Sequence, residues 1–289
     1  MPAADAFEAE RRRLTGLAYR MLGSVADAED IVQDAWLRWD RLGPTGPEQV
    51  ERPPAWLTTT VSRLALDRLK SAQRQRETYV GPWLPEPVLT TGDPADSVEL
   101  AESLTLGFLV VLERLSPVER AVFLLVDVFG EPFATVAEVV ERSEEACRQI
   151  AHRARGRVRD DRRHHPPPSA ANELVNAFLG ACAMGDVTTL RQLLAEEVVL
   201  VSDGGARVHA ARHPIVGFDR VARFVVNLTK RMPADTRACP SAVNGESGLV
   251  TFRGETPWFV MAFEVADDRI VAIRLIINPD KLVRAGSPA

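Results

Sequence analysis

Hydrophobic residues recur with a helical period through most of the first 160 positions of the chain. They return every three or four positions between residues 5 and 76, and again from residue 116 to residue 159, which predicts amphipathic helices in both stretches. A loop rich in glycine and proline at 43–54 divides the first stretch. The second stretch is predicted to contain three short helices, at 116–130, 133–140 and 144–159.

The pattern changes after residue 170. Segments with a helical pattern are 172–186, 187–197 and 213–232, and segments with a strand-like pattern are 196–203, 248–254, 257–267 and 269–280. Helices followed by a curled antiparallel sheet predict an α+β cone. Together with a proline-rich linker at 79–98, these patterns predict all-α domains at 5–78 and 99–163 and an α+β domain at 170–285.

Composition and charge narrow the functional classes. The 289 residues are 46% hydrophobic and 26% charged, as in an ordinary globular protein, and the net charge of −5 does not by itself indicate nucleic-acid binding. Positive charge is nevertheless concentrated at 63–76 and 148–163, and local patches matter more than the total. The three cysteines are far apart, so neither a disulfide framework nor a zinc site is indicated. No signal-peptide core and no membrane-length apolar run is present, which predicts a cytoplasmic protein. No metal or other cofactor is predicted.

The helix predicted at 144–159 has an apolar face and a basic face. The basic face carries Glu145, Arg148, Gln149, His152, Arg153, Arg155 and Arg159. Arginine and glutamine suit base edges in the major groove, and a short helix, a tight turn and a basic helix form a helix-turn-helix. The alternative is a solvated basic helix, but the use of arginine rather than lysine favours recognition of DNA.

Two further surfaces stand out in the first stretch. Leu37 lies in the middle of a polar helix face with Asp30, Gln33 and Asp34, which is either a single exposed leucine or the apolar anchor of a partner site. The helix after the 43–54 loop combines an aromatic residue and a threonine with basic residues: Trp56, Thr60, Arg63, Arg68 and Lys70. Such a surface fits capture of single-stranded DNA, and it equally fits an ordinary helix with solvated basic residues.

Three blocks in this order resemble an extracytoplasmic-function (ECF) sigma factor of the sigma-70 family. They are LAYRMLGSVADAEDIVQDAWLRW, PPAWLTTTVSRLALDRLKS and the block from LSPVERAVFLLVDVFG to residue 160, and the resemblance covers residues 7–160. The first two blocks resemble region 2 and the last resembles region 4. The resemblance implies a subunit that directs core RNA polymerase to promoter DNA and initiates transcription.

The resemblance also implies roles for the surfaces. The face with Asp30, Gln33, Asp34 and Leu37 corresponds to the part of region 2 that docks on the clamp helices of the polymerase β′ subunit, in a complex that also includes the β subunit. Loop 43–54 and helix 55–72 correspond to the part that opens and reads the −10 element, and helix 144–159 corresponds to the −35 reader.

Shorter motifs resemble the sigma-J-like subgroup, which carries an extra C-terminal domain. WLPEP, which contains Trp83, Leu84 and Pro85, is similar to the linker signature of that subgroup. NPDKL, which contains Asn278, Pro279, Asp280 and Lys281, matches its terminal motif, and SDGGAR approximates its glycine motif with Ala206 in place of a glycine. The resemblance implies a SnoaL-like (NTF2-like) domain that contacts the linker through these residues and modulates transcription in cis, without a separate anti-sigma factor.

Relatives of the SnoaL-like fold include enzymes with an acid–base pair inside the cone. Asp203, His209 and His213 are the candidates here, but the two tyrosines of the chain, Tyr19 and Tyr79, lie outside the predicted domain. Pro214 argues against the helix that would place both histidines on one metal ion. The chain is therefore predicted not to be an enzyme. Two alternatives stay open, a helix-turn-helix repressor and an enzyme whose N-terminal half is regulatory.

Overall fold

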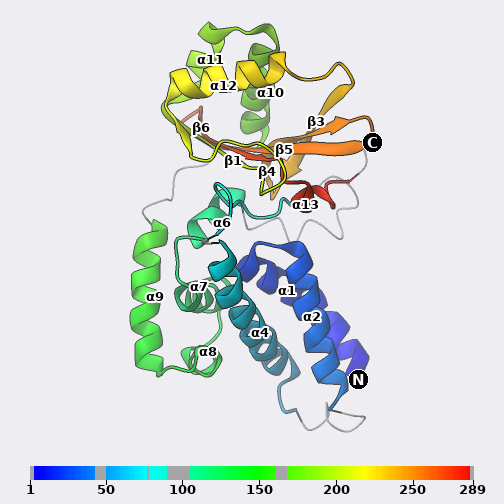
Figure 1. Ribbon diagram of the computed structural model, residues 1–289. Helices are drawn as coiled ribbons and strands as arrows, with labels where there is room; N and C mark the ends of the chain where they lie inside the picture. The colour runs from blue at the N-terminus through cyan, green and yellow to red at the C-terminus, as the bar shows by residue number, and fades with distance from the viewer. Residues whose placement is uncertain (1–2, 43–49, 77, 90–104, 160–167, 287–289) are drawn as a thin grey trace. The chain divides into compact units, whose positions relative to one another are not determined.

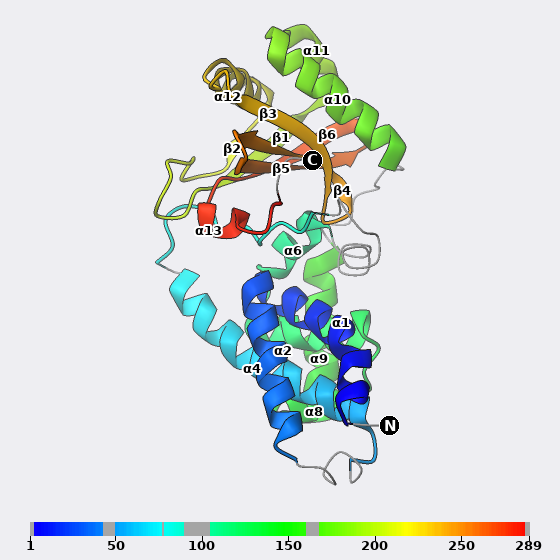
Figure 2. The same ribbon diagram turned by 90° about the vertical axis from the view of Figure 1, so that its right-hand side faces the viewer.

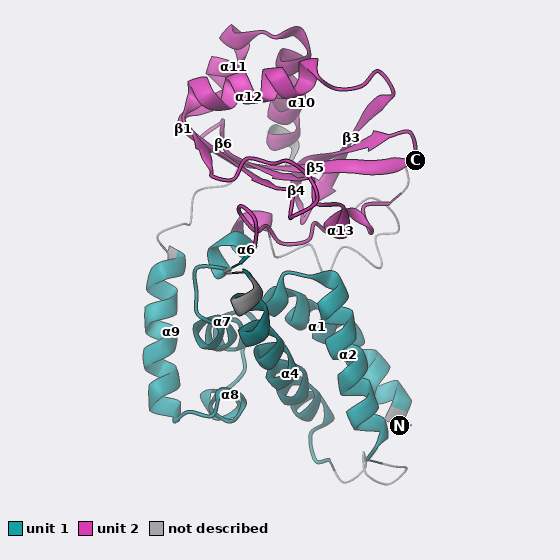
Figure 3. Ribbon diagram, viewed as in Figure 1, with its two compact units in different colours: residues 1–78, 108–162 teal, residues 79–107, 163–289 magenta. Residues whose placement is uncertain are grey.

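The computed structural model describes residues 3–42, 50–76, 78–89, 105–159 and 168–286. The chain forms two compact units, one from residues 1–78 and 108–162 and the other from residues 79–107 and 163–289 (Figure 3). Residues 79–107, which include the predicted linker, thus group with the C-terminal part of the chain. Within the described ranges, no helix is long and apolar enough to cross a membrane.

Three long helices form the N-terminal part of the first unit: α1 (Ala3–Leu22), α2 (Val25–Asp40) and α4 (Pro53–Arg76) (Figure 1). Gly23 has a φ of +69° and turns the chain after α1. The Ser24 hydroxyl then caps α2 by accepting a hydrogen bond from the Asp27 amide at 3.2 Å. Most of the predicted loop at 43–54 lies outside the described residues.

The second helical group contains α6 (Leu106–Leu112), α7 (Pro117–Phe123), η1 (Leu124–Val128), α8 (Phe133–Val140) and α9 (Glu144–Arg159). The capping box predicted at Ser116 and Glu119 is present at the start of α7. One helix was expected from 116 to 130, but the chain changes to the π-helix η1 at Leu124. The wider turn buries the consecutive residues Leu124 and Leu125 together in the core.

The second unit contains a six-stranded sheet with the strand order β2-β1-β6-β5-β4-β3. Its strands are β1 (Leu194–Asp203), β2 (Ile215–Val216), β3 (Thr236–Val243), β4 (Glu246–Arg253), β5 (Thr256–Ala266) and β6 (Arg269–Ile276). The remaining helices are α10 (Pro168–Met184), α11 (Val187–Leu193), α12 (Phe218–Lys230) and α13 (Pro279–Leu282). The predicted α+β architecture is confirmed.

Details of the sheet differ from the sequence-based expectation. Residues 194–195 were expected to be helical but begin β1, and the overlap of the two predictions at 196–197 is resolved as strand. Residues 215–216 form a short strand instead of helix. β3 was not predicted, because small residues and Pro240 weaken its pattern; β3 lies at the edge of the sheet, where proline is tolerated. The sheet is also not wholly antiparallel, since β1 pairs with β6 in parallel.

The two faces of this sheet are covered differently. Helices α10, α11 and α12 lie on one face and enclose the main hydrophobic core, which includes Phe178, Phe218 and Phe263 (Figures 1 and 2). The opposite face is approached by α13 and by residues 79–89 (Figure 2). Leu84 to Pro87 are all buried there, so the WLPEP segment is part of the packed structure of the second unit.

Candidate functional site

The candidate DNA-reading helix α9 presents one continuous polar face. Cys147, Ile150, Ala154 and Val158 are buried, which leaves Glu145, Arg148, Gln149, His152 and Arg153 exposed along the other side. The Ser143 hydroxyl oxygen caps α9 by accepting a hydrogen bond from the Ala146 amide at 3.2 Å. α8 ends with Glu141 in the left-handed conformation, at a φ of 55°, and this tight turn completes a helix-turn-helix.

Some of the basic residues of α9 already have partners within the first unit. Arg148 pairs with Glu144 at 2.7 Å, and Arg155 is half-buried and pairs with Asp127 at 2.8 Å. The predicted site residue Arg159 is the last residue of α9, and its side chain lies outside the described residues. Arg155 therefore supports the position of the helix against η1, whereas Gln149, His152 and Arg153 are turned to solvent.

The polar face of α2 includes one exposed apolar residue next to acidic and amide side chains. Asp30, Gln33 and Asp34 are exposed, and Leu37 is 41% exposed on the same face. The opposite side of α2 buries Ile31, Ala35 and Trp39 in the core of the first unit, so the helix position is fixed by packing. The exposed leucine thus has the geometry of an anchor with an acidic rim.

The candidate −10 residues on α4 differ in accessibility, since the basic ones are exposed and the other two are half-buried. Trp56 is half-buried and its ring lies 5.3 Å from that of Trp39, and Thr60 is also half-buried. The Arg63 guanidinium donates a 2.8 Å hydrogen bond to the carbonyl oxygen of Glu138 on α8. The other basic residues pair nearby: Arg68 with Asp27 at 3.6 Å and with Asp30 at 3.8 Å, and Lys70 with Asp67 at 3.3 Å.

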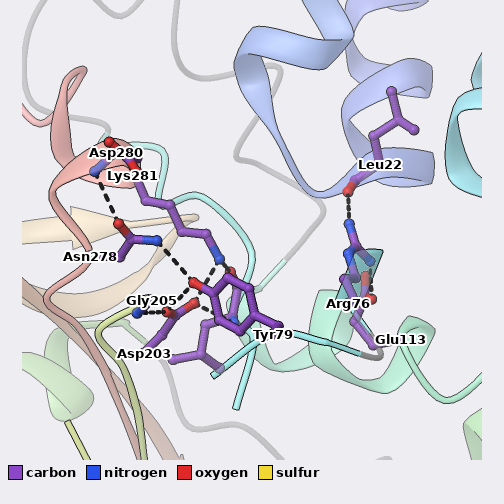
Figure 4. Close-up of polar contacts among 10 residues, drawn as sticks. Leu22, Arg76, Tyr79, Glu113, Asp203, Gly205, Asn278, Asp280 and Lys281 are labelled. Carbon is purple, nitrogen blue, oxygen red and sulfur yellow. Dashed lines mark hydrogen bonds and ion pairs between the residues drawn. The ribbon is translucent and has the colours of Figure 1, made fainter. Parts of the chain in front are cut away.

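A largely but not fully buried carboxylate joins the two helical groups of the first unit. Glu113 forms an ion pair with Arg76 at the end of α4 (Figure 4). It forms a second ion pair with Arg120 on α7, and we call these three residues the Glu113 bridge. Arg76 also donates to the carbonyl oxygen of Leu22 at 2.6 Å, and Arg120 donates to that of Arg20 at 3.1 Å. Burial lowers the pKa of Arg76, although Glu113 opposes the shift. The bridge therefore ties the ends of α1 and α4 to α7.

A second buried carboxylate holds the WLPEP segment on the sheet of the second unit. Asp203 is fully buried at the end of β1, and its two carboxylate oxygens receive four hydrogen bonds (Figure 4). One oxygen accepts from the Tyr79 hydroxyl at 2.6 Å and from the Gly205 amide at 3.0 Å. The other accepts from the Leu84 amide at 2.8 Å and from the Lys281 ammonium at 2.6 Å.

The residues around Asp203 connect the predicted linker and terminal motifs directly. Lys281 also donates to the carbonyl oxygen of Leu84, and its ammonium lies 4.1 Å from the centroid of the Trp83 ring. Asn278 donates to the Tyr79 hydroxyl at 2.9 Å. We call Tyr79, Leu84, Asp203, Asn278 and Lys281 the linker clasp.

The other predicted interdomain residues surround this clasp. Pro85 is buried, Pro279 begins α13 and is exposed, and Asp280 points outward to Arg207 at 3.3 Å. A further contact follows along the linker, where the amide of Asn244 donates to the carbonyl oxygen of Val88 at 2.8 Å. The structure thus gathers six of the seven predicted residues at or beside the clasp and turns Asp280 to its rim.

Tyr79 is a functional residue that the sequence did not reveal. It precedes the predicted C-terminal domain, yet its hydroxyl donates to Asp203 in the second unit. Burial, together with the carboxylate of Asp203, raises the pKa of Tyr79. The available signal was its place at the start of the stiff YVGPWLPEP segment, which carries it to the domain.

The candidate catalytic residues do not assemble. Asp203 is saturated by the clasp, while His209 and His213 are exposed in the loop after β1. Among the described residues, no group of three histidines, cysteines or carboxylates is placed to hold a metal ion. A base needs a free lone pair near its substrate, so Asp203 serves as a structural acceptor in this arrangement.

A third buried carboxylate lies where α6 begins. Burial raises the pKa of Glu246 to about 7, although Arg274 and the amides of Gly107 and Leu106 act to lower it. Arg274 instead pairs with Glu264 at 2.5 Å. Leu106 and Gly107, the last residues of the second unit's N-terminal segment, are thus attached to the sheet through Glu246.

Comparisons with known proteins match this arrangement along almost the whole chain. Residues 6–75 match the family Sigma-70 region 2, and residues 107–158 match Sigma-70, region 4. The ECF RNA polymerase sigma factor SigJ of Mycobacterium tuberculosis is 44% identical over 298 residues, which cover 98% of this chain and 93% of SigJ. The chain belongs to the ECF family of RNA polymerase sigma factors. The predicted family and function are confirmed, and neither the repressor nor the enzyme with a regulatory half is supported.

Two further relatives support the full-length relationship of this sigma factor. The probable ECF RNA polymerase sigma factor SigI of Mycobacterium tuberculosis is 34% identical, over 97% of this chain and 95% of SigI. The crystal structure of Mycobacterium tuberculosis SigJ has a TM-score of 0.78 and 40% identity, and the alignment covers 99% of both chains. This sigma factor therefore shares the C-terminal α+β domain with relatives that are similar over their whole length.

Proposed function

We propose that this sigma factor directs core RNA polymerase to promoters through three surfaces of its first unit, and that its C-terminal domain modulates this activity by holding the linker. The polymerase clamp helices bind the α2 face around Leu37. The −10 element is taken by α4 and the 43–54 loop, and the −35 duplex is read by the exposed face of α9. The linker clasp is the observation that carries the modulation, because it fixes the segment between the two DNA-binding regions.

The −35 surface is supported by the chemistry of the exposed α9 residues. Arg148, Gln149 and Arg153 offer donors that pair with base edges or phosphates, and Glu145 offers an acceptor for a cytosine amino group. Arg155 contributes by fixing α9 through Asp127. Specificity for the −35 sequence thus rests on the exposed residues of the helix, and the orientation of the helix rests on Arg155.

The first unit must open to use both DNA surfaces at once. The −10 and −35 elements are separated by about 25 base pairs, which is roughly 85 Å of duplex. α4 is about 36 Å long, and α8 contacts it through the hydrogen bond between Arg63 and Glu138. Region 4 therefore moves away from α4 on promoter binding, and this releases Arg63 from the Glu138 carbonyl oxygen for the −10 strand.

The modulation in cis follows from where the clasp acts. Residues 79–107, which connect region 2 to region 4, group with the C-terminal unit. A connection held by another domain limits how far the two regions separate, as a shorter linker would. The domain thereby performs within the chain the task of a separate anti-sigma factor.

A substitution in the α2 face tests the proposal, with affinity for purified core polymerase and run-off transcription as the measurements. Leu37→Asp places a charge in the apolar centre of the α2 face, so we expect core binding to weaken at least tenfold while the thermal unfolding temperature is kept. Val187→Asp, at a 51% exposed apolar residue of the second unit, is the matched control. Full core affinity in the Leu37→Asp protein would exclude this face as the polymerase site.

A further inference from the structure

The loop between β1 and β2 is held in a closed shape by its own hydrogen bonds. The Ser202 hydroxyl accepts from the Ala211 amide at 2.9 Å, and the Val208 amide donates to the carbonyl oxygen of Gly204 at 3.2 Å. A side chain at Gly204 would meet the Val208 oxygen at 2.4 Å, so only glycine permits this fold-back. The loop therefore has one defined conformation.

A cavity of about 180 Å³ lies between this loop and the start of the linker. Its walls are loop residues 205–212 on one side and Val80 and Gly81 on the other, all within the second unit. Gly81 approaches the loop closely, since a Cβ there would lie 3.6 Å from the Cα of Arg212. Gly205, which donates to Asp203 in the linker clasp, is part of the same wall.

The charge of the lining selects the kind of occupant. Arg207, His209 and Arg212 line the cavity, and none of the described residues in its walls is acidic. Asp280 pairs with Arg207 at 3.3 Å, but both side chains are well exposed and such pairs are weak. Arginine side chains favour carboxylate and phosphate oxygens, which they bind with two parallel hydrogen bonds.

We propose that this cavity is a binding site for a small anion with a carboxylate or phosphate group, and that its occupant holds the start of the linker on the C-terminal domain. The volume equals that of about six water molecules, which suits inorganic phosphate or a small carboxylic acid rather than a nucleotide. An occupant touches the loop and residues 80–81 together, so it binds the docked linker in preference to the released one. The effect on transcription rests on the proposed function, whereas the binding site itself does not.

Titration calorimetry on the full chain tests the site. Inorganic phosphate and succinate are the probes, each at constant ionic strength with chloride as the reference salt, and the comparison between them separates phosphate from carboxylate recognition. We expect saturable binding of at least one probe and slower amide hydrogen exchange in residues 79–84 when it is bound. The double variant Arg207→Ala/Arg212→Ala should lower the affinity at least tenfold.

Two further variants keep the result interpretable. Arg220→Ala/Arg223→Ala removes the same charge from exposed positions of α12 outside the cavity, and it should bind like the parent chain. Ala206→Trp adds a large ring to the cavity wall and should abolish binding without removing any charge. Absence of saturable binding, or equal loss in both double-arginine variants, would overturn the site. Binding with slower exchange but unchanged transcription would support the site and reject the proposed modulation.

Discussion

Two carboxylates with little solvent exposure join distant segments of this sigma factor, and their hydrogen-bonding capacity is satisfied to different degrees. Asp203 is fully buried, and each of its oxygens accepts two hydrogen bonds. Glu113 is 21% exposed in its side chain, and each oxygen has one arginine partner. In the Glu113 bridge, Arg120 also has a buried nitrogen, Nη2, without a hydrogen-bond partner in the part of the chain that the structure describes.

This difference indicates which of the two contacts is harder to break. A fully satisfied buried network is rigid, whereas an unpaired buried donor costs free energy in the closed state. Under the proposed function, we therefore expect the linker to leave the C-terminal domain less readily than region 4 leaves region 2. Opening of the Glu113 bridge should then need less free energy from polymerase and promoter binding than opening of the clasp.

The largest expected effect follows from removing the charge at the centre of the clasp. Asp203→Asn keeps the size of the side chain. It removes the negative charge that pairs with Lys281, and it replaces one acceptor oxygen with an NH2 donor. Breaking a buried ion pair costs about 3–5 kcal/mol. We expect the free energy of unfolding of the second unit to fall by that amount, as measured by chemical unfolding. We also expect the level of run-off transcription to change.

A control separates this effect from a general loss of charge. Asp235 pairs with Arg253 at 3.4 Å on an exposed surface of the same unit. Asp235→Asn should change the unfolding free energy by no more than about 0.5 kcal/mol. If Asp203→Asn were equally mild, the clasp would not be the stable attachment of the linker.

A smaller effect with the opposite consequence for activity is expected at the Glu113 bridge. Glu113→Gln leaves Arg76 and Arg120 without a charged partner, which should destabilise the closed first unit by about 2–3 kcal/mol. Since opening precedes promoter binding in the proposal, core polymerase should bind the variant more tightly, by tenfold or more. Titration of labelled core polymerase measures this change.

Glu138→Gln is the matched control for this variant. It removes one negative charge from an exposed side chain of α8 and leaves the backbone oxygen that accepts from Arg63 in place. Its affinity for core polymerase should equal that of the parent chain. Weaker core binding by Glu113→Gln would mean that the closed packing assists polymerase binding, and the comparison above would then be reversed.

The helical half of this fold was predictable because its signals are local. Ser24, Ser116 and Ser143 cap helices as the sequence indicates, and the apolar face of α9 is buried as its period requires. The exposed faces around Leu37 and Gln149 follow from the same periods. Motif resemblance also singled out Trp83 and Lys281, which lie in contact in the structure, although it could not supply their shared partner Asp203.

The unpredicted features depend on contacts between distant residues. Asp203 was considered as an acid–base candidate because a sequence does not reveal how many donors surround a carboxylate. Tyr79 lies 124 positions away from it along the chain, and only folding brings the pair together. The parallel pairing of β1 with β6 is likewise set by the closure of the cone, and not by any pattern within either strand.

The smallest expected effect concerns Glu246. It distinguishes whether a charged or a neutral Glu246 side chain attaches the start of α6 to the sheet. Burial raises the pKa of Glu246 from 4.5 to about 7, so the folded chain binds its proton more tightly than the unfolded chain. The stabilising contribution of this raised pKa is complete below pH 4.5 and is lost as pH rises through 7. Glu246→Gln mimics the protonated form, so it should match the parent chain at pH 4.5 and exceed its unfolding free energy by about 1–3 kcal/mol at pH 8. Chemical unfolding at the two pH values measures this, with Glu255→Gln at an exposed turn as the control.

A loss of stability in Glu246→Gln at pH 8 would instead show that ionised Glu246 is held by Arg274, as Asp203 is held by Lys281. The start of α6 would then be attached to the sheet by charge.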